Sequence, residues 1–379
     1  MEIVAAVIGA KDAEFAIGHV QLEKPRSDEL LVRLVAAGMC HTDLSVVAQA
    51  TPFPLPAILG HEGVGVVEEA GSGVTEFKPG DPVVLSFTFC GVCRACRSGQ
   101  PVYCDHWLPL NLLGGSRLDG SSAYSVGSGS VHGHFFGQSS FATHTVVNER
   151  AAVKAPGDVP LPALAPFGCG VQTGAGAVFQ VAAPQPGSDV VIFGAGGVGL
   201  SAVMAARLTP AARIIAVDVN PRRLRLAADL GATHTVNSAD ADAVETVREL
   251  TAGGADVAIE TSGRVPVLGQ AVRSLRSAGT CVVIGAPPLG SELAVDVPDL
   301  LGRGIRLVGT NQGDSAPRNT IPRLIDLYRA GVFPVDRIVT NYPFTAINQA
   351  AGDVRSGTAI KPVLLLDVAP DAAMSACRG

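Results

Sequence analysis

Residues 190–208 read VVIFGAGGVGLSAVMAARL and combine an apolar run, a glycine motif and an alanine-rich segment. The apolar run ends at Phe193, and Gly194, Gly196 and Gly199 form the pattern G-x-G-x-x-G. The first glycine of such a motif allows a tight turn, the second lets backbone N–H groups approach a pyrophosphate, and the third allows a helix to pack closely on the strand. The pattern predicts a strand, a turn and a helix that bind a dinucleotide, with an ordinary glycine-rich turn as the alternative.

The sequence after this motif continues to alternate between strands and helices. Asp218 ends the apolar run RIIAVDVN, where a carboxylate can accept hydrogen bonds from the adenosine ribose and repel a 2′-phosphate. This position favours NAD over NADP. The pattern predicts a doubly wound parallel sheet. Its further expected elements are strands within residues 255–263, 280–287 and 305–311 and helices within residues 221–232 and 265–279.

The first third of the chain has a different pattern. Short apolar runs at residues 29–38, 63–71 and 81–87 are separated by Gly and Pro, and few windows have a helical period. We therefore expect an antiparallel, barrel-like domain here and an α/β protein overall, because 379 residues exceed the usual size of one domain. The Ser/Gly-rich residues 118–134 are predicted to form a surface loop.

Four of the eight cysteines lie in one loop, FCGVCRACRSGQPVYCDH, residues 89–106. The spacing C-x2-C-x2-C-x7-C offers four thiolates, which suits a tetrahedral zinc ion with no open position. Such a site orders the loop and does not catalyse a reaction. Two disulfides or an iron–sulfur cluster are the alternatives. The predicted ligands are Cys90, Cys93, Cys96 and Cys104.

A second, dispersed set of residues is the better candidate for catalysis. Cys40, His61 and Cys169 each lie close to glycines, in GMCHTD, GHEG and GCGVQTG. Two thiolates and one imidazole leave one coordination position of zinc open. Taken one at a time, such cysteines are more often small buried apolar residues, and such a histidine is more often a core or surface residue.

Composition excludes several classes of function. The formal charge of −6 is spread along the chain, and no run of Lys and Arg suggests binding to nucleic acid or to an anionic membrane. The N-terminus does not resemble a signal peptide, and no stretch of about 18 apolar residues occurs. We expect a cytoplasmic protein, in which clustered cysteines bind metal more often than they form disulfides.

Four motifs in order carry a resemblance to a known family: GHEG at residues 60–63, the four-cysteine loop, GCGVQTG at 168–174 and GAGGVG at 194–199. Together they resemble the zinc-dependent medium-chain alcohol dehydrogenases along nearly the whole chain. FGCGVQTGAGAV and HGHFFGQSSFATH are similar to the aryl-alcohol and allylic terpene-alcohol branch. The resemblance implies the following domains: a GroES-like catalytic domain at 1–170 with a structural zinc lobe at about 87–110, a Rossmann NAD-binding domain at 171–309, and a return to the catalytic domain at 310–379.

The resemblance also implies roles for individual residues. Asp43 matches a carboxylate that orients the ligand histidine, Glu62 a glutamate near the metal, and Thr42 the hydroxyl that takes the alcohol proton; surface acids and a structural threonine are the alternatives. The implied ligands of the catalytic zinc are Cys40, His61 and Cys169, and the four clustered cysteines bind the second zinc. The implied contacts to NAD are His41, Thr173, Gly194, Gly196, Gly197, Val198, Gly199, Asp218 and Arg223.

One position departs from the family pattern. Many members end the proton relay with a histidine, but the matching residue here is Ser45, and a serine does not accept a proton near neutral pH. Either a chain of water molecules carries the proton, or His41 replaces the missing base.

The function implied by the resemblance is reversible hydride transfer from a primary aromatic or allylic alcohol to NAD, which gives the aldehyde. Phenylalanine and tryptophan side chains around the zinc motifs are expected to supply apolar walls. The alternatives are a glutathione-dependent formaldehyde dehydrogenase, a general alcohol dehydrogenase, and a non-catalytic zinc-loop interaction protein. The long insert between Cys104 and residues 141–147 resembles that of dimeric members, so we expect a homo-oligomer and favour a dimer.

Overall fold

The computed structural model describes residues 1–127 and 129–366 of the chain. The chain separates into two compact units, which are described one at a time. The second unit comprises Gly170–Ser315 and Leu327–Val335. The first unit comprises Met1–Cys169, Ala316–Asp326 and the described residues from Asp336.

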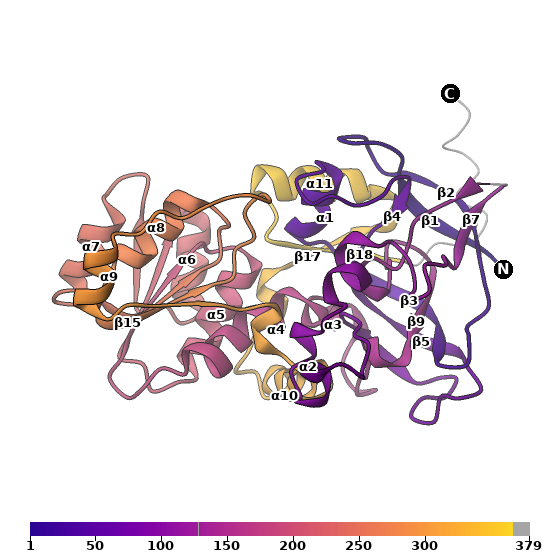
Figure 1. Ribbon diagram of the computed structural model, residues 1–379, viewed down its shortest axis with the longest axis horizontal. Helices are drawn as coiled ribbons and strands as arrows, with labels where there is room; N and C mark the ends of the chain where they lie inside the picture. The colour runs from indigo at the N-terminus through magenta and orange to yellow at the C-terminus, as the bar shows by residue number, and fades with distance from the viewer. Residues whose placement is uncertain (128, 367–379) are drawn as a thin grey trace. The chain divides into compact units, whose positions relative to one another are not determined.

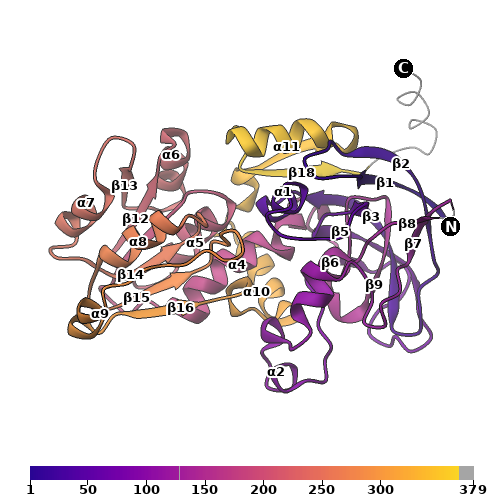
Figure 2. The same cartoon turned by 45° about the horizontal axis from the view of Figure 1, so that its top comes forward.

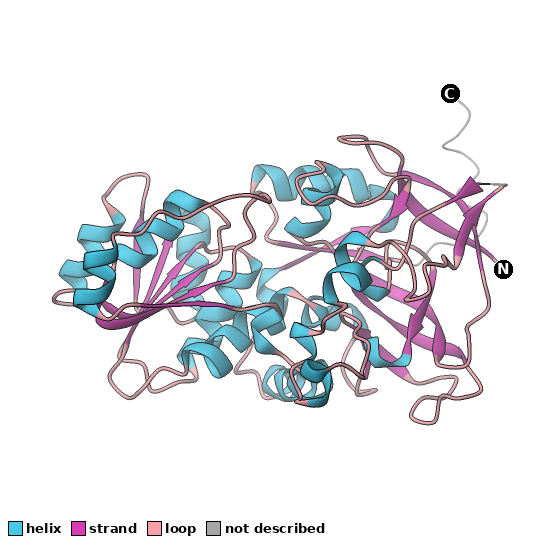
Figure 3. Ribbon diagram, in the orientation of Figure 1, coloured by secondary structure: helices cyan, strands magenta, loops and turns pink. Residues whose placement is uncertain are grey.

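The second unit is built on a six-stranded parallel sheet with the order β13-β12-β11-β14-β15-β16. The order reverses between β11 and β14, which is the topological switch point where ligands bind in such sheets. Helices lie on both faces of the sheet (Figure 3). The strands are β11 (Asp189–Phe193), β12 (Arg213–Asp218), β13 (His234–Asn237), β14 (Ala255–Glu260), β15 (Leu275–Val283) and β16 (Arg306–Gly309). The helices are α4 (Gly170–Gly176), α5 (Gly197–Arg207), α6 (Pro221–Leu230), α7 (Ala243–Leu250), α8 (Val265–Arg273) and α9 (Val297–Arg303).

Small residues set the packing at the centre of this unit. All five residues of β11 are buried, as expected for a strand covered on both faces. A side chain at Gly174 of α4 would place its Cβ 2.1 Å from the carbonyl oxygen of Val198 in α5, so these two helices can pack closely only with glycine there. The doubly wound sheet predicted from the sequence is thus confirmed.

The helix predicted within residues 265–279 is too long. Helix α8 ends at Arg273, and β15 begins two residues later with the buried Leu275, which pairs with Ala255 of β14. Arg276 then forms an ion pair of 3.0 Å with Asp189. Helical periodicity continues through this segment, but pairing with the sheet determines its conformation.

The first unit contains two mostly antiparallel sheets, which can be followed in Figure 2. One has the order β4-β1-β2-β7-β8, and the other has the order β10-β6-β5-β3-β18-β17 with β9 also paired to β3. The strands of the first sheet are β1 (Glu2–Ile8), β2 (Ala16–Leu22), β4 (Ala57–Ile58), β7 (Tyr124–Val126) and β8 (Gly129–Ser130). The strands of the second are β3 (Glu29–Gly38), β5 (Glu62–Ala70), β6 (Pro82–Leu85), β9 (His144–Asn148), β10 (Ala152–Lys154), β17 (Val339–Pro343) and β18 (Lys361–Leu365).

Helices and short helical turns complete the chain (Figure 1). The remaining α-helices are α1 (His41–Val47), α2 (Arg94–Arg97), α3 (Leu161–Leu164), α10 (Pro317–Arg329) and α11 (Ile347–Ser356). The 3-10 and π segments are Pro101–Tyr103, Pro109–Leu113, Phe135–Gly137, Glu149–Ala151, Ala165–Gly168, Ala177–Ala182, Gln312–Asp314, Val335–Ile338 and Phe344–Ala346.

The C-terminal part of the chain returns to the first unit. Strand β18 pairs with β3 in antiparallel register, with Val363 opposite Gly38. The second unit nevertheless extends to Ser315, beyond the expected boundary at 309, because the turn at Gln312–Asp314 packs on α4. A Cβ at Gly176 would lie 2.2 Å from the carbonyl oxygen of Gly313.

The prediction of a surface loop for residues 118–134 is wrong for its centre. Tyr124 and Val131 are buried, and β7 joins the first sheet by pairing with β2. The Tyr124 hydroxyl lies 2.8 Å from Oγ1 of Thr145 and donates to the carbonyl oxygen of Gln138 at 3.2 Å. An aromatic side chain within a polar, glycine-rich segment anchors that segment to the sheet.

Candidate active site and metal centres

Three residues far apart in the sequence meet in the first unit. The Sγ atoms of Cys40 and Cys169 and a ring nitrogen of His61 all lie within 4.8 Å of one another. Cys40 caps the N-terminus of α1, His61 directly precedes β5, and Cys169 follows the turn Ala165–Gly168. Ligand atoms around a tetrahedral zinc ion are separated by roughly 3.5 to 4 Å, so this cluster has the dimensions of a zinc site with three protein ligands.

One ring nitrogen of His61 is positioned to bind a cation. Its Nδ1 lies 3.2 Å from Oδ1 of Asp43, which places the proton of the neutral ring on Nδ1. Its Nε2 is buried and has no hydrogen-bond partner among the described residues. Burial alone would lower the pKa of His61, but the Asp43 carboxylate and the nearby Cys40 raise this pKa to about 10. Since Asp43 bonds Nδ1, Nε2 is the ring nitrogen left for a metal ion, which binds the neutral imidazole.

The two cysteines complete a donor set that fits zinc. A hydrogen bond with Cys169 holds the pKa of Cys40 well below its usual value. The same hydrogen bond, together with burial, raises the pKa of Cys169. The lowered pKa favours the thiolate form of Cys40, and a divalent cation would stabilise the thiolate form of both cysteines. Two soft sulfur donors and one imidazole match the chemistry of zinc.

Asp43 connects both ligand loops. Its Oδ2 accepts a hydrogen bond from the backbone N–H of Cys40 at 2.9 Å, and its Oδ1 accepts one from the backbone N–H of Gly60 at 3.0 Å. The side chain is fully buried, so the alternative of a surface acid is wrong. One carboxylate fixes the ring of His61 and the backbone of its two neighbouring loops.

Glu62 has a partner that the sequence did not reveal. Nζ of Lys361 lies 2.8 Å from Oε1 and 2.9 Å from Oε2 of Glu62, and both side chains are buried. Burial disfavours the charged lysine, but the Glu62 carboxylate raises the pKa of Lys361 above its usual value. Glu62 is therefore not a surface acid. A lysine at the start of the apolar strand KPVLL, β18, was the available signal.

The residues of the expected proton relay lie on α1. Oγ1 of Thr42 lies 3.7 Å from Sγ of Cys40, so its hydroxyl is beside the ligand cluster. Ser45 donates its hydroxyl to the carbonyl oxygen of His41 at 3.1 Å, which is bonding within the helix. His41 begins α1 and is exposed.

The four-cysteine loop forms a second cluster in the same unit. The sulfur atoms of Cys90, Cys93, Cys96 and Cys104 lie within 4.8 Å of one another. Sγ of Cys90 and Sγ of Cys96 are 3.9 Å apart, whereas a disulfide needs about 2.05 Å, and the cysteines in the described ranges are all free. A hydrogen bond from the backbone N–H of Cys96 lowers the pKa of Cys93 to about 6. The disulfide alternative is wrong, and the donors suit a metal.

Aromatic rings surround the imidazole of His61. The ring of Phe136 stacks on it, with centroids 4.3 Å apart and an interplanar angle of 21°. Phe135 meets the imidazole edge-on at 5.3 Å, and Trp107 meets Phe136 edge-on at 5.6 Å. Apolar, aromatic walls therefore lie directly beside the ligand cluster.

The glycine motif occupies the turn between β11 and α5 in the second unit. Gly194 has a φ of +96°, and a Cβ at Gly199 would lie 1.8 Å from the carbonyl oxygen of Gly194. At Gly196, which caps α5, no described atom beyond its chain neighbours and the helix backbone lies within 4 Å of the position of a Cβ, so space remains in front of the helix N-terminus. Gly197 and Val198 begin the helix, and its N–H groups suit a pyrophosphate.

The carboxylate of Asp218 reaches back to this turn. It accepts hydrogen bonds from the backbone N–H of Ala195 at 2.7 Å and from that of Asn220 at 2.8 Å. Thr173 lies on α4 with its Oγ1 3.3 Å from Oε1 of Gln312. Arg223 lies on α6, and its buried Nε has no hydrogen-bond partner in the described part of the chain. The structure thus brings Asp218 to the glycine turn.

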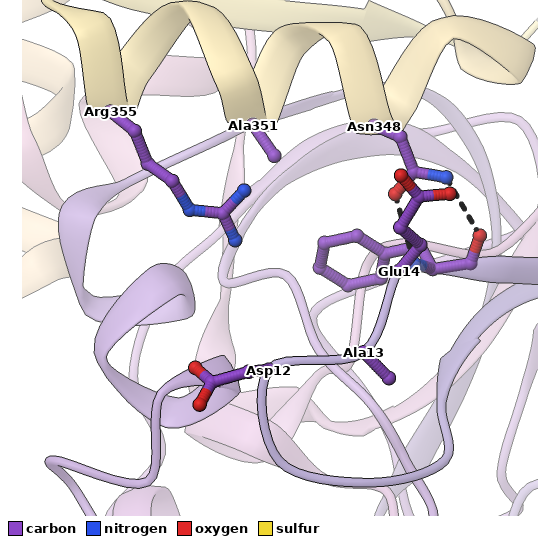
Figure 4. Close-up of a pocket in the computed structure, with 7 residues that line it drawn as sticks. Asp12, Ala13, Glu14, Asn348, Ala351 and Arg355 are labelled. Atoms are coloured by element: carbon purple, nitrogen blue, oxygen red, sulfur yellow. Dashed lines mark hydrogen bonds between the residues drawn. The ribbon is translucent and has the colours of Figure 1, made fainter.

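A pocket of the first unit lies away from both clusters. Asp12, Glu14 and Arg355 line it, and two hydrogen bonds between Asn348 and the backbone of Phe15, 2.9 and 3.0 Å long, close one side (Figure 4). None of the predicted site residues lines this pocket. Separately, no helix within residues 1–127 and 129–366 is long and apolar enough to cross a membrane.

Comparison with known families supports this picture. Residues 26–157 match the family described as alcohol dehydrogenase GroES-like domain, and residues 197–330 match the family described as zinc-binding dehydrogenase. These matches confirm the predicted fold class, a GroES-like domain combined with a Rossmann sheet.

Relatives match over almost their whole length. The chain is 43% identical over 362 residues to geraniol dehydrogenase of Castellaniella defragrans, which covers 95% of this chain and 97% of that protein. A solved alcohol dehydrogenase zinc-binding domain protein of Burkholderia ambifaria is 48% identical with a TM-score of 0.94, covering 97% of this chain and 100% of that one. Benzyl alcohol dehydrogenase of Acinetobacter calcoaceticus is 45% identical with a TM-score of 0.93, covering 96% and 99%.

These relatives do not favour a glutathione-dependent formaldehyde dehydrogenase or a non-catalytic zinc-loop protein. The fold, the donor sets and the comparisons agree on one family and on a zinc-dependent oxidoreductase with a nicotinamide cofactor. The chain belongs to the zinc-dependent medium-chain alcohol dehydrogenases.

Proposed function

We propose that this enzyme oxidises primary aromatic or allylic alcohols to aldehydes with NAD, in a reversible reaction. The observation that carries the proposal is the group of aromatic rings, Phe135, Phe136 and Trp107, packed beside the imidazole of His61. Flat, conjugated alcohols suit such walls because rings pack on rings. The relatives named for geraniol and benzyl alcohol support the same substrate class.

In this proposal Cys40, His61 and Cys169 hold a catalytic zinc ion, and the four clustered cysteines hold a structural one. When bound, the catalytic zinc supplies a Lewis acid that lowers the pKa of an alcohol, and a bound nicotinamide supplies a hydride acceptor. The protein holds the ligand geometry through Asp43 and keeps the buried charge of Glu62 neutralised by Lys361. The structural cluster stabilises the loop at residues 89–106 and takes no part in the reaction.

Thr42 is the proposed acceptor of the alcohol proton, because its hydroxyl lies beside Cys40 on the first turn of α1. Ser45 does not continue the relay as a base, since a serine does not accept a proton near neutral pH. The proton then leaves through water, or through His41, whose exposed ring begins the same helix. Replacement of His41 by Gln distinguishes these routes, since only a lost base is rescued by added buffer bases.

We propose NAD as the cofactor rather than NADP. The carboxylate of Asp218 stands at the end of β12 beside the glycine turn, where it can accept from ribose hydroxyls and repel a 2′-phosphate. The proposed contacts also include Gly194, Gly196, Gly197, Val198, Gly199, Thr173, Arg223 and His41.

A homodimer and a cytoplasmic location complete the proposal. Strand β16 ends the order of its sheet, with Leu307 exposed, and the neighbouring helix α9 exposes Val297 and Leu301. An edge strand beside exposed apolar residues suits pairing with a second copy. Reduced, clustered cysteines suit the cytoplasm. Light scattering of wild type and of Leu301→Glu tests the dimer, because a monomeric wild type would contradict it.

The test of function is a substrate panel. Benzyl alcohol, geraniol, ethanol, 2-propanol and hydroxymethylglutathione are compared by kcat/KM with NAD and with NADP. We expect benzyl alcohol or geraniol to exceed ethanol by at least about two orders of magnitude, since apolar pockets discriminate by a few kcal/mol per added group. If ethanol or 2-propanol were the best substrate, the substrate class would be wrong, while the zinc and cofactor assignments would be unaffected.

A further inference from the structure

Residues 132–141, HGHFFGQSSF, follow an uncommon backbone path in the first unit. The φ angles of His134, Phe136 and Ser139 are +56°, +53° and +53°, in the left-handed region that residues other than glycine seldom adopt. Such conformations persist only where the surrounding structure determines them, and they concentrate at functional sites. This segment contacts the main chain beside His61, through the amide of Gln138.

Gln138 contacts the main chain on both sides of a proposed zinc ligand. Its side-chain Oε1 accepts a hydrogen bond from the backbone N–H of Gly63 at 3.0 Å, and its Nε2 donates to the carbonyl oxygen of His61 at 2.9 Å. The amide is fully buried, so no water competes for these bonds. The residue between the two bonded positions is Glu62.

The same amide is connected to the loop of a second ligand. Nε2 of Gln138 also donates to the carbonyl oxygen of Ser86 at 3.1 Å. The hydroxyl of Ser86 in turn donates to the carbonyl oxygen of Gly168 at 2.8 Å, directly before Cys169. One side chain thus joins the backbone at His61 to the backbone that leads to Cys169.

Close packing leaves little freedom around this amide. A Cβ at Gly63 would lie 3.0 Å from Oε1 of Gln138 and 2.7 Å from Cβ of Ser140, so glycine is required for the approach. Phe136, two residues before Gln138, stacks on the imidazole of His61 at 4.3 Å. The segment therefore contacts both the ring and the main chain of the ligand.

We propose that Gln138 is a positioning residue of the catalytic metal site: its amide fixes the backbone of His61 and of the Cys169 loop, and so sets the geometry of the ligand atoms. Asp43 orients the imidazole from Nδ1, and Gln138 holds the main chain that carries it. Residues that orient metal ligands in this indirect way typically change metal affinity 10- to 100-fold when replaced. This inference rests on the proposed ligand set of Cys40, His61 and Cys169.

The test replaces Gln138 by Met, which fills the space without an amide. A second variant, Gln138→Glu, has the same size and keeps the acceptor for Gly63 but loses both donors. The matched control is Ser139→Ala, which removes hydrogen bonds of the neighbouring residue to Ile58 and Phe135 without touching the backbone of His61. Ser140→Ala removes a buried hydroxyl that has no hydrogen-bond partner among the described residues.

Two readouts do not depend on activity. The first is the rate at which a chelator removes the more labile metal from the holoenzyme. The second is the visible spectrum after Co²⁺ replaces that metal, because d–d bands report ligand geometry. We expect metal loss about 10- to 100-fold faster in Gln138→Met and a changed cobalt spectrum in both Gln138 variants. Ser139→Ala is expected to lower Tm but to keep the wild-type rate and spectrum, and Ser140→Ala to keep all three.

Two results would overturn the inference. A folded Gln138→Met or Gln138→Glu protein with the wild-type rate and cobalt spectrum would show that the amide does not position the ligands. A spectrum changed equally by Ser139→Ala would show general loosening of the segment. If wild type bound a single metal ion and Cys169→Ser left the cobalt spectrum unchanged, the ligand set itself would be wrong, and the inference would fall with it.

Discussion

Oδ1 of Asp43 lies 3.2 Å from Nδ1 of His61, and both side chains are completely buried. The contact joins α1 to the residue before β5 and leaves Nε2 of His61, which has no hydrogen-bond partner among the described residues, as the ring atom available to a metal. A carboxylate in this place accepts a hydrogen bond from Nδ1–H and makes the imidazole a better ligand.

Asp43→Asn is expected to weaken the catalytic metal site. An amide that presents its NH₂ group to Nδ1 favours the tautomer with the proton on Nε2, which blocks the ligand atom. We expect a loss of metal affinity of about 10- to 100-fold in chelator competition, with the second metal retained. Asp12→Asn, an exposed acid with a φ of +57° that asparagine tolerates, serves as the control. If Asp43→Asn had the metal affinity of wild type, Asp43 would have no role in orienting the ligand His61.

Lys361→Met is expected to lower the free energy of unfolding strongly, because it leaves the buried Glu62 carboxylate without its cation. Breaking a buried ion pair from one side costs about 3–5 kcal/mol, and adding Glu62→Gln should recover part of this. Lys154→Met is the matched control, since its ammonium pairs with Asp81 at 2.9 Å but is largely exposed and contributes about 0–1 kcal/mol. Urea unfolding with zinc present measures all four proteins. Similar losses for the two lysines would contradict the buried pair.

Cys104→Ser is expected to affect mainly stability, and Cys169→Ser is expected to affect mainly activity. Cys104 lies in the closed four-sulfur cluster, so its replacement should lower stability and the yield of holoprotein. Cys169 lies in the three-ligand cluster, so its replacement should abolish turnover and largely preserve the fold. Metal analysis should find two zinc ions per wild-type chain. A normally stable Cys104→Ser protein, or one metal per fully active chain, would disprove the assignment.

Asp218→Ser is expected to shift cofactor preference toward NADP. The change removes an acceptor for ribose hydroxyls and the repulsion of a 2′-phosphate. The ratio of kcat/KM with NAD to that with NADP is the measurement. Glu245→Gln removes one negative charge from an exposed position at the start of α7. It therefore controls for the change in the net charge of this unit. A ratio equal to that of wild type would place Asp218 outside the adenosine pocket.

The buried His134 is expected to make stability depend on pH. Burial lowers the pKa of His134 to about 3, and its Nε2 accepts a hydrogen bond from the backbone N–H of Ala123 at 3.2 Å. The unfolded chain, with a histidine pKa of about 6.5, binds the proton more readily than the folded chain. The contribution of the neutral ring is therefore complete above pH 6.5 and is lost as the pH falls toward 3.

His134→Asn should remove this dependence. The difference in unfolding free energy between wild type and variant should decrease by up to about 1.4 kcal/mol per pH unit below 6.5, because only wild type has the titrating ring. Urea unfolding at pH 7, 6 and 5 measures the difference, with the exposed His19→Asn as the control. A difference that stays constant with pH would show that His134 is protonated as easily in the fold as outside it.

Local patterns explain what could be predicted from the sequence. The four-cysteine loop and the glycine motif each lie within a short segment, so the spacing of their residues is enough to predict each site. In the structure the four cysteines form one cluster, and the glycines form the turn before α5. Lys361 and Gln138 escaped prediction because their partners Glu62 and His61 are 299 and 77 residues away in the chain. The apolar strand after Lys361 indicates that this lysine is buried but does not identify its partner, and nothing near Gln138 distinguishes it from an ordinary polar side chain.

The end of α8 shows the same limit for secondary structure. A helical period extends through residues 274–279. In the structure, however, Leu275 pairs with Ala255 in the sheet and Arg276 forms an ion pair with Asp189. Tertiary contacts override the local preference at this point. The segment at 118–134 is similar, because one buried tyrosine outweighs its polar composition.

The ion pair of Glu62 and Lys361 can form only late in the synthesis of these residues, because the two are far apart in the chain. At a translation rate of about 5–20 residues per second, the lysine leaves the ribosome roughly 15 to 60 s after the glutamate, because 299 residues separate them. During that time the nascent N-terminal sheet lacks β18 as well as the cation, since this strand pairs with β3. The growing chain must keep the carboxylate hydrated, so this unit reaches its final structure only after β18 has been synthesised.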